Sequence, residues 1–336
     1  RGSMDVMQFT QALSRIWVLE TRLLDKSKVE RMLEANSADE VLKILGETEY
    51  ANIMGNVKRA ADYEEVLSTE LKRVYKLVYE LCPVKEIVDL MSIKYKYHNI
   101  KVLLKGKFLD KDFSNMLIDL GNEDLNELKR KIDTDNFRDL KGNVEKAVLE
   151  VIADFEANKD PQNIDIIVDR YMFKELVEIK KSLNYKFTDK LVNAIIDATN
   201  VRTLLRIKKQ GKGREFASEV LVSGGSISKD TLVAIINETP ENIISKLSTS
   251  AYSDLIKEGV ESYIATNSAN LLEKLSDNYI MDLMKSGKLV TFGPERILSY
   301  IYAKETEIKI IRIIMVGKLN NIAEEVIRER LRDIYV

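Results

Sequence analysis

The sequence has 336 residues, of which 45% are apolar, so the chain can bury a sizeable core and fold without help from metals or disulfides. Its 52 basic and 54 acidic side chains leave a net charge of −2, which argues against a nucleic-acid-binding protein, because such proteins carry a basic excess on at least one segment. The single cysteine, Cys82, excludes a disulfide framework and favours a reducing compartment.

The N-terminal segment is expected to be neither a signal peptide nor a membrane span. The opening "RGSMDVM" lacks the apolar core of a signal peptide, and Arg1–Ser3 read as a remnant of cloning before a natural start at Met4. The longest unbroken apolar run, Leu232–Ile236, has five residues, whereas a membrane-spanning helix needs about 20. The sequence therefore predicts no transmembrane segment.

Apolar residues recur at spacings of three and four almost throughout the chain, which predicts an all-α protein. A leading helix is expected over 8–23 and a tail over 320–336. The stretch 211–229 has the weakest pattern, and a loop is expected around Gly224 and Gly225. Each of the four prolines suits the first turn of a helix, where a missing N–H costs nothing; they are Pro83, Pro161, Pro240 and Pro294.

The chain contains an internal repeat. Three stretches align without gaps, and all three carry an apolar residue at six shared offsets. Ser37 with Glu40 has the pattern of a capping box, and Thr239 is a suitable N-cap before Pro240. Each stretch is therefore predicted to form a short helix, a turn and a second short helix. The stretches are "LDKSKVERMLEANSADEVLKI" (24–44), "FLDKDFSNMLIDLGNEDLNEL" (108–128) and "ISKDTLVAIINETPENIISKL" (227–247).

A second repeated pattern consists of apolar residues flanked by basic ones. It reads "HNIKVLLKGKF" (98–108), "TNVRTLLRIKK" (199–209) and, less closely, "TEIKIIRIIMVGK" (306–318). The order of these parts predicts three similar helical modules. Such modules would pack most naturally around a pseudo-threefold axis as a compact ring or funnel. The predicted boundaries are 4–107 with the N-terminal helix, 108–226, and 227–336 with the C-terminal tail.

The usual patterns of catalysis are missing from the sequence. His98 is the only histidine, which excludes a histidine cluster around a metal and a Ser-His-Asp triad, so a structural role is expected for it. No basic residue stands at a spacing from Cys82 that would indicate an activated thiol. The Gly-Lys pairs do not belong to a GxxxxGK[ST] motif. The sequence therefore predicts no catalytic residue, no cofactor site and no metal site.

One short segment, "IKYKYHN" (93–99), alternates basic and aromatic residues. This pattern can indicate binding to a single-stranded nucleic acid. In a chain of nearly neutral charge, the flank of an amphipathic helix is the preferred interpretation. Neither a nucleic acid nor a small-molecule substrate is therefore expected as a partner.

The C-terminal segment closely resembles the signature of one rotary-ATPase subunit. The residues that carry the resemblance are "GPERILSYIYAKETEIKIIRIIMVGKLNNI" and "IRERLRDIYV", within 293–336. "HNIKVLLKGK" and "DATNVRTLLRIKK" resemble the two internal copies of that signature in the family. "VSGGSIS" resembles the family's Gly-Gly turn, which opens the third pair of short helices. The family is the central-stalk component that is named C in archaeal and bacterial A/V-type ATPases and d in eukaryotic V-ATPases. The resemblance extends over essentially the whole chain from Met4.

The resemblance implies an all-helical funnel and a mechanical function. The wide end of the funnel would sit on the cytoplasmic face of the membrane, against the rotor ring of proteolipid subunits. Its hollow would receive the rotating shaft, made of a long coiled-coil subunit and its small companion. As a peripheral member of this complex, the chain would couple ATP-driven rotation to transport of H+ or Na+. It would hydrolyse nothing and bind no cofactor.

Six basic residues of the repeated pattern are expected to contact these partners. They lie at i,i+3 or i,i+4 beside apolar stripes, so they would line a socket wall in equivalent places of the three modules. The alternative is that they are ordinary solvated flanks of buried helices. The six are Lys101, Lys105, Arg202, Arg206, Lys309 and Arg312.

Two other functions fit the residues taken alone. The chain could be a helical-repeat adaptor for unrelated soluble protein partners, or an enzyme with an unrecognised site. Co-purification with a proteolipid ring and a coiled-coil shaft would separate the rotor component from the adaptor. Turnover by the purified chain would identify the enzyme.

Overall fold

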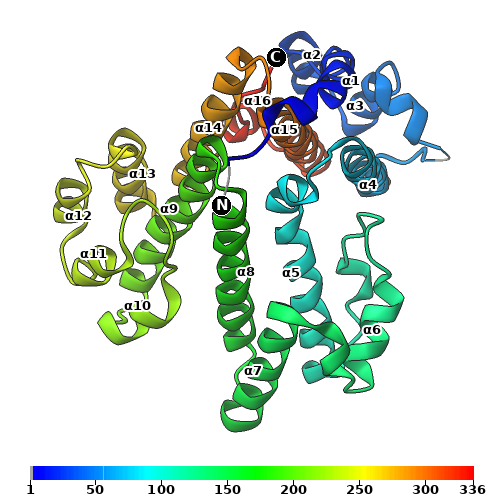
Figure 1. Cartoon of the computed structure of the whole chain (residues 1–336). Coiled ribbons are helices and arrows are strands. Elements are labelled where there is room, and N and C mark those ends of the chain that lie inside the picture. Colours follow the sequence, from blue (N-terminus) through cyan, green and yellow to red (C-terminus); the bar gives the residue numbers. More distant parts are fainter. Residues whose placement is uncertain (1–2, 56) are drawn as a thin grey trace. The chain divides into compact units, whose positions relative to one another are not determined.

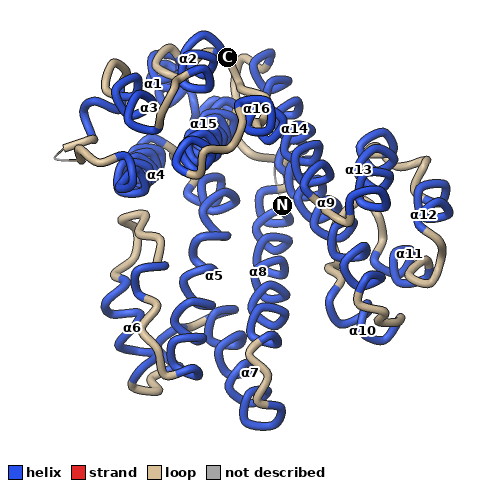
Figure 2. Tube along the Cα trace, turned by 180° about the vertical axis from the view of Figure 1, so that it is seen from behind, coloured by secondary structure: helices blue, strands red, loops and turns tan. Residues whose placement is uncertain are grey.

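The computed structural model describes residues 3–55 and 57–336, and in this part of the chain every regular element is a helix (Figure 2). The predicted all-α class is confirmed. Of the residues read as a cloning remnant, Arg1 and Gly2 lie outside the described residues, as does Asn56 within the first predicted module.

The chain divides into two units. The middle unit comprises Ser92–Ser276 with Ser3 and Met4. The terminal unit combines Asp5–Met91 with Asp277–Val336. Both boundaries fall inside helices, α5 (Lys85–Leu109) and α14 (Asn270–Ser286).

Helix α15 (Glu295–Leu319) is the centre of the terminal unit, because its apolar residues occur on nearly all sides and must all be covered. It packs against α1 (Thr10–Glu20), α3 (Ala38–Leu45), α4 (Tyr63–Leu81) and α16 (Glu324–Arg330), which surround it in Figures 1 and 2. The other elements of this unit are η1 (Val6–Phe9), α2 (Lys26–Glu34), η2 (Glu49–Ile53), η3 (Ala60–Asp62) and η6 (Gly287–Leu289).

The middle unit is built around long helices. Helix α7 (Gly142–Asn158) lies along α8 (Gln162–Leu183), and α8 also packs against α9 (Lys186–Lys209) (Figure 1). Short helices cover the end of α9, where α10 (Arg214–Val220) contacts both α9 and α11 (Lys229–Ala234). The remaining elements are η4 (Ser114–Met116), α6 (Leu125–Asp133), η5 (Phe137–Leu140), α12 (Pro240–Lys246) and α13 (Ser253–Thr266).

The first and third repeated stretches form the predicted pairs of short helices, α2 with α3 and α11 with α12. The Ser37 hydroxyl accepts the N–H of Glu40 at 3.2 Å, and Thr239 caps α12, which begins at Pro240. The other prolines stand just outside the helices that they introduce: Pro161 and Pro294 one residue before α8 and α15, and Pro83 two residues before α5.

The second stretch does not form the predicted pair of helices. Residues 108–109 are the last turn of α5, and 110–124 hold only η4. The reason is local competition, because the Asp112 and Asp119 carboxylates accept N–H groups two residues further on, at 2.9 and 2.8 Å. Apolar spacing alone overlooked these turns. The short helix α6 begins after its own cap, Asp124.

The repeated basic-apolar pattern forms the ends of three long helices, α5, α9 and α15. Each helix stops in the same way, with an N–H bonding back to the carbonyl five residues earlier. In each case a residue with positive φ reverses the chain. The reversing residues are Asp110, Gly211 and Asn321. The three copies of the pattern therefore share one kind of helix ending.

Two buried asparagines hold the segments that follow these helix ends. The Asn99 amide exchanges two hydrogen bonds with the backbone of Ile118, both of 2.8 Å. Asn200 does the same with Val222, at 2.8 and 2.9 Å. Each asparagine side chain therefore forms hydrogen bonds with both the backbone N–H and the backbone C=O of one residue that is not in a helix.

Gly259 of α13 packs directly against Leu272 of α14 in the middle unit. A Cβ atom at this position would lie 2.6 Å from Leu272 Cδ1 and 3.0 Å from its Cα, and Leu272 is itself buried. We expect Gly259→Val to lower the free energy of unfolding by about 3 kcal/mol, because a packed core resists added volume. The control Glu258→Val, on the exposed side of the same helix, should change it by about 0.5 kcal/mol or less. Equal effects in urea unfolding would contradict the close packing.

Candidate functional site

The first predicted basic pair lies on α5, where it faces acidic residues of α8. Lys101 forms a salt bridge with Asp169 and lies 3.9 Å from Asp165. Lys105 pairs with Asp165 at 2.9 Å. Both lysines are half-buried, and their charges are balanced within the middle unit.

The second pair lies on α9, and its two members differ. Arg202 Nη1 is 3.8 Å from Glu273 Oε1, at the start of α14. Arg206 is exposed and has no salt bridge in the part of the chain that the structure describes. Among the six predicted contact residues, Arg206 is therefore the one whose charge is not balanced by a salt bridge within the described residues.

The third pair lies on α15 in the terminal unit. Lys309 Nζ is 2.8 Å from Asp277 Oδ2, and the Arg312 guanidinium makes two hydrogen bonds to Glu64, of 2.6 and 3.2 Å. Exposed ion pairs of this kind are worth about 0–1 kcal/mol each. A partner with its own acidic groups can therefore replace them at little cost, and partner binding by the six residues remains a prediction.

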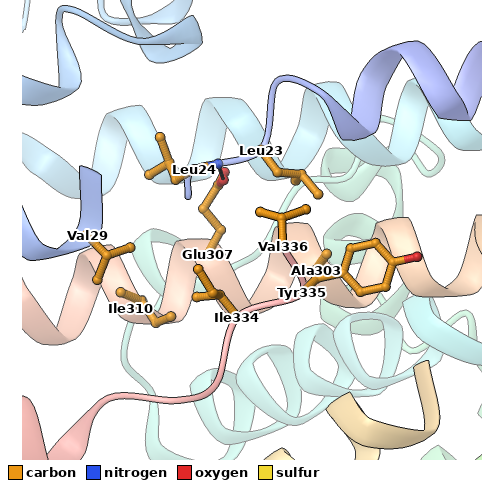
Figure 3. A pocket seen from close by; sticks show the side chains of 9 residues that line it. All are labelled: Leu23, Leu24, Val29, Ala303, Glu307, Ile310, Ile334, Tyr335 and Val336. Carbon is orange, nitrogen blue, oxygen red and sulfur yellow. Dashed lines mark hydrogen bonds between the residues drawn. The ribbon is translucent and has the colours of Figure 1, made fainter. Parts of the chain in front are cut away.

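A buried polar network surrounds Glu307, in the middle of α15, and was not predicted from the sequence. The carboxylate accepts the Leu24 N–H at 2.7 Å and the Tyr50 hydroxyl at 2.6 Å. It also accepts a hydrogen bond of 2.6 Å from Lys304 Nζ. Figure 3 shows the Glu307 side chain directed at the backbone of Leu24. One carboxylate thus connects α15 to two segments near the other end of the chain.

The charges in this network are balanced. Lys304 Nζ is also 3.9 Å from Glu70, which in turn accepts a hydrogen bond from Arg73. Burial opposes the charge on Lys304, but Glu307 and Glu70 outweigh burial and raise its pKa above the usual value. Burial, together with the charge of Glu307, raises the pKa of Tyr50 well above its usual value. Lys304 therefore stays charged and Tyr50 stays a neutral donor.

A signal for this network was present in the sequence. Lys304 is three residues after Ile301 and four before Ile308, so it lies on an apolar stripe of the helix. Charged residues on such a stripe are rarely buried unless they are paired. Leu24, which donates to Glu307, is 283 positions away from it, and no local pattern points to this contact.

A narrow cavity of about 10 Å³ lies beside Glu307, between α15 and the chain's C-terminal residues (Figure 3). This volume is near the lower limit for one water molecule. The cavity is lined by Leu23, Leu24, Val29, Ala303, Glu307, Ile310, Ile334, Tyr335 and Val336. The space is a packing defect beside a polar network and is too small for an organic ligand.

His98 and Cys82, the sole histidine and cysteine of the sequence, each contact a backbone carbonyl oxygen. His98 Nε2 lies 2.9 Å from the carbonyl oxygen of Met116. Burial raises the pKa of the Cys82 thiol to about 11, and its Sγ donates a hydrogen bond to the Val84 carbonyl. Within the described residues, no group of three or more His, Cys, Asp or Glu side chains is placed to hold a metal ion, and no helix is long and apolar enough to span a membrane.

Comparison with known proteins assigns the chain to a family. The chain belongs to the ATP synthase (C/AC39) subunit family, whose model matches residues 12–330. It is therefore a stalk subunit of a V/A-type rotary ATPase, with a structural role and no catalytic one.

Named relatives match the chain over nearly its full length. The C subunit of the V-type sodium ATPase of Enterococcus hirae is 31% identical over 94% of this chain and 95% of its own length. The C subunit of the A-type ATP synthase of Methanocaldococcus jannaschii is 25% identical over 97% of this chain and 87% of its own. That of Methanobrevibacter smithii is also 25% identical, over 95% and 86%.

Proposed function

We propose that this chain is the central-stalk rotor component that couples the rotating shaft of a V/A-type ATPase to the membrane ring of proteolipid subunits. The observation that carries the proposal is membership of the C/AC39 family over residues 12–330. In this function the chain transmits torque between the shaft, which comprises the coiled-coil subunit and its small companion, and the ring. It would be held peripherally at the cytoplasmic face of the membrane.

The proposed arrangement is a funnel of three modules, 4–107, 108–226 and 227–336, related by pseudo-threefold symmetry. Local features support it: α5, α9 and α15 end in the same hydrogen-bond pattern, and Asn99 and Asn200 make equivalent backbone contacts. Densely packed helices with short connections resist twisting, as transmission of torque requires. The transported ion is H+ or Na+, and the selectivity would reside in the ring.

The test is a mixing experiment with the shaft subunits and the detergent-solubilised ring, followed by size exclusion. The proposal expects the chain to co-elute with both. Elution apart from both would overturn it and would favour the alternative, a helical-repeat adaptor for unrelated soluble protein partners.

The predicted contact residues can be tested in the same system. Charge reversal of both Arg202 and Arg206 to Glu should weaken binding of the shaft pair at least about tenfold at low salt, because it replaces attraction by repulsion toward acidic groups. The matched control reverses Lys246 and Lys257, which are exposed in the same unit and change the net charge equally. Circular dichroism should show unchanged helicity in both variants. Unaltered affinity of the Arg202/Arg206 variant would remove the two residues from the interface.

A further inference from the structure

Three large apolar side chains of the terminal unit are directed to solvent. Trp17 on α1 is 60% exposed, Leu289 at the end of η6 is 89% exposed, and Phe292 in the loop before α15 is 41% exposed. Single exposed apolar residues are normal, but neighbouring ones indicate an interaction surface. We refer to Trp17, Leu289 and Phe292 as the Trp17 patch.

Arg296 connects the two segments that carry this patch. Its guanidinium carbon lies 5.3 Å from the Trp17 ring, and Nη1 donates to the Lys288 carbonyl at 3.2 Å. Nη2 donates to Glu20 on α1 at 2.6 Å. The residue before Leu289 is thus fixed beside Trp17.

The base of the loop is held in place. Lys288 Nζ donates to the Tyr335 carbonyl at 2.7 Å and lies 4.0 Å from the centre of the Tyr335 ring, which is buried. The exposed side chains therefore project from a fixed support, and insertion into a partner would cost little ordering of the backbone.

The segments around the patch are basic although the whole chain is slightly acidic. Residues 14–22 and 285–296 together contain five basic side chains and two acidic ones. Of the two acidic residues, Glu20 forms a salt bridge with Arg296, and Glu295 is buried. The charge left at the surface of these segments is positive, which complements an anionic surface. The five basic residues are Arg15, Arg22, Lys285, Lys288 and Arg296.

We propose that the Trp17 patch inserts into the interface of an anionic lipid bilayer, with Arg15, Arg22 and Lys285 at the level of the lipid phosphates. Tryptophan prefers the boundary between water and hydrocarbon, and an apolar loop tip beside basic groups can bind a membrane without spanning it. This inference deepens the proposed function and depends on it for the presence of a membrane beside the chain. A protein partner would have to supply a pocket for Leu289, whereas a bilayer accepts a projecting side chain anywhere on its surface.

The test uses Trp17 itself, because it is the only tryptophan in the chain. The full chain is mixed with protein-free vesicles of phosphatidylcholine containing about 30% phosphatidylglycerol, and Trp emission and co-sedimentation are measured. We expect a blue shift, quenching by brominated acyl chains, and at least tenfold weaker binding to pure phosphatidylcholine or in 0.5 M salt.

The variant Leu289→Asp/Phe292→Asp should lose at least tenfold in vesicle affinity. Its control, Leu109→Asp/Leu149→Asp, removes two exposed leucines of the middle unit and should bind as the unmodified chain does. No blue shift with anionic vesicles, or equal loss in both variants, would overturn the inference.

Failure of the lipid inference is distinguishable from failure of the proposed function, because the vesicles contain no ring. Should the Leu289/Phe292 variant bind vesicles normally but fail to co-elute with the ring, the patch contacts protein and the lipid inference is wrong. Co-elution with the ring and shaft would still support the coupling function.

Discussion

Glu307→Gln is expected to lower the free energy of unfolding by about 3–5 kcal/mol, because it leaves the buried Lys304 ammonium without its nearest carboxylate. Glu70 also attracts Lys304, but at 3.9 Å it lies beyond hydrogen-bond distance and it is already engaged by Arg73. The new amide keeps only one acceptor oxygen, so its NH2 group must face either the Leu24 N–H or the Lys304 ammonium, and both of these are donors. Urea unfolding, followed by circular dichroism, measures the loss.

Two further variants make this result specific. Glu34→Gln removes the same charge from an exposed position on α2 and should change stability by about 0.5 kcal/mol or less. Lys304→Met/Glu307→Gln removes the buried cation as well, so it should recover at least about half of the loss. A Glu307→Gln variant as stable as Glu34→Gln would show that the network does not hold the terminal unit together.

Asn200→Ala is expected to cost about 2–3 kcal/mol, because it removes both hydrogen-bond partners of the Val222 peptide at a fully buried position. Asn99→Ala should have a similar effect, since Asn99 makes the same two bonds with Ile118.

The control for the asparagines is Asn143→Ala. Asn143 donates a hydrogen bond of 2.9 Å to Glu178 at an exposed site, so its loss should cost about 0.5 kcal/mol or less. If Asn200→Ala and Asn143→Ala unfold at the same urea concentration, the backbone contacts of Asn200 contribute nothing particular to stability.

The sequence predicted the elements whose signals are local. Ser37, Thr239 and the apolar spacing around them were sufficient to predict α3 and α12, because a cap and an amphipathic face act within one helix. The same spacing was wrong over 108–128, where Asp112 and Asp119 form turns through their own backbone.

The candidate site was less predictable than the fold. The basic residues of the repeated pattern could be named, but the carboxylates that pair with them, such as Asp165 with Lys105 and Glu64 with Arg312, come from other helices. The Glu307 network depends on a contact with Leu24 across 283 positions, and single-sequence periodicity carries no information about such distant pairs.

The composition of the terminal unit also determines the order in which the two units can fold during synthesis. The segment Asp5–Met91 leaves the ribosome first, but the helix that covers its apolar surface, α15, begins only at Glu295. The middle unit is nearly continuous in sequence, so it can fold before α15 has been synthesised, at a time when Asp5–Met91 cannot yet complete its packing. During that interval α2, α3 and α4 present uncovered apolar faces, which makes the nascent chain a natural client for chaperones. A chain released before Glu307 is made would lack the acceptor for the Leu24 N–H and the Tyr50 hydroxyl, so these two early segments could not be fixed in place.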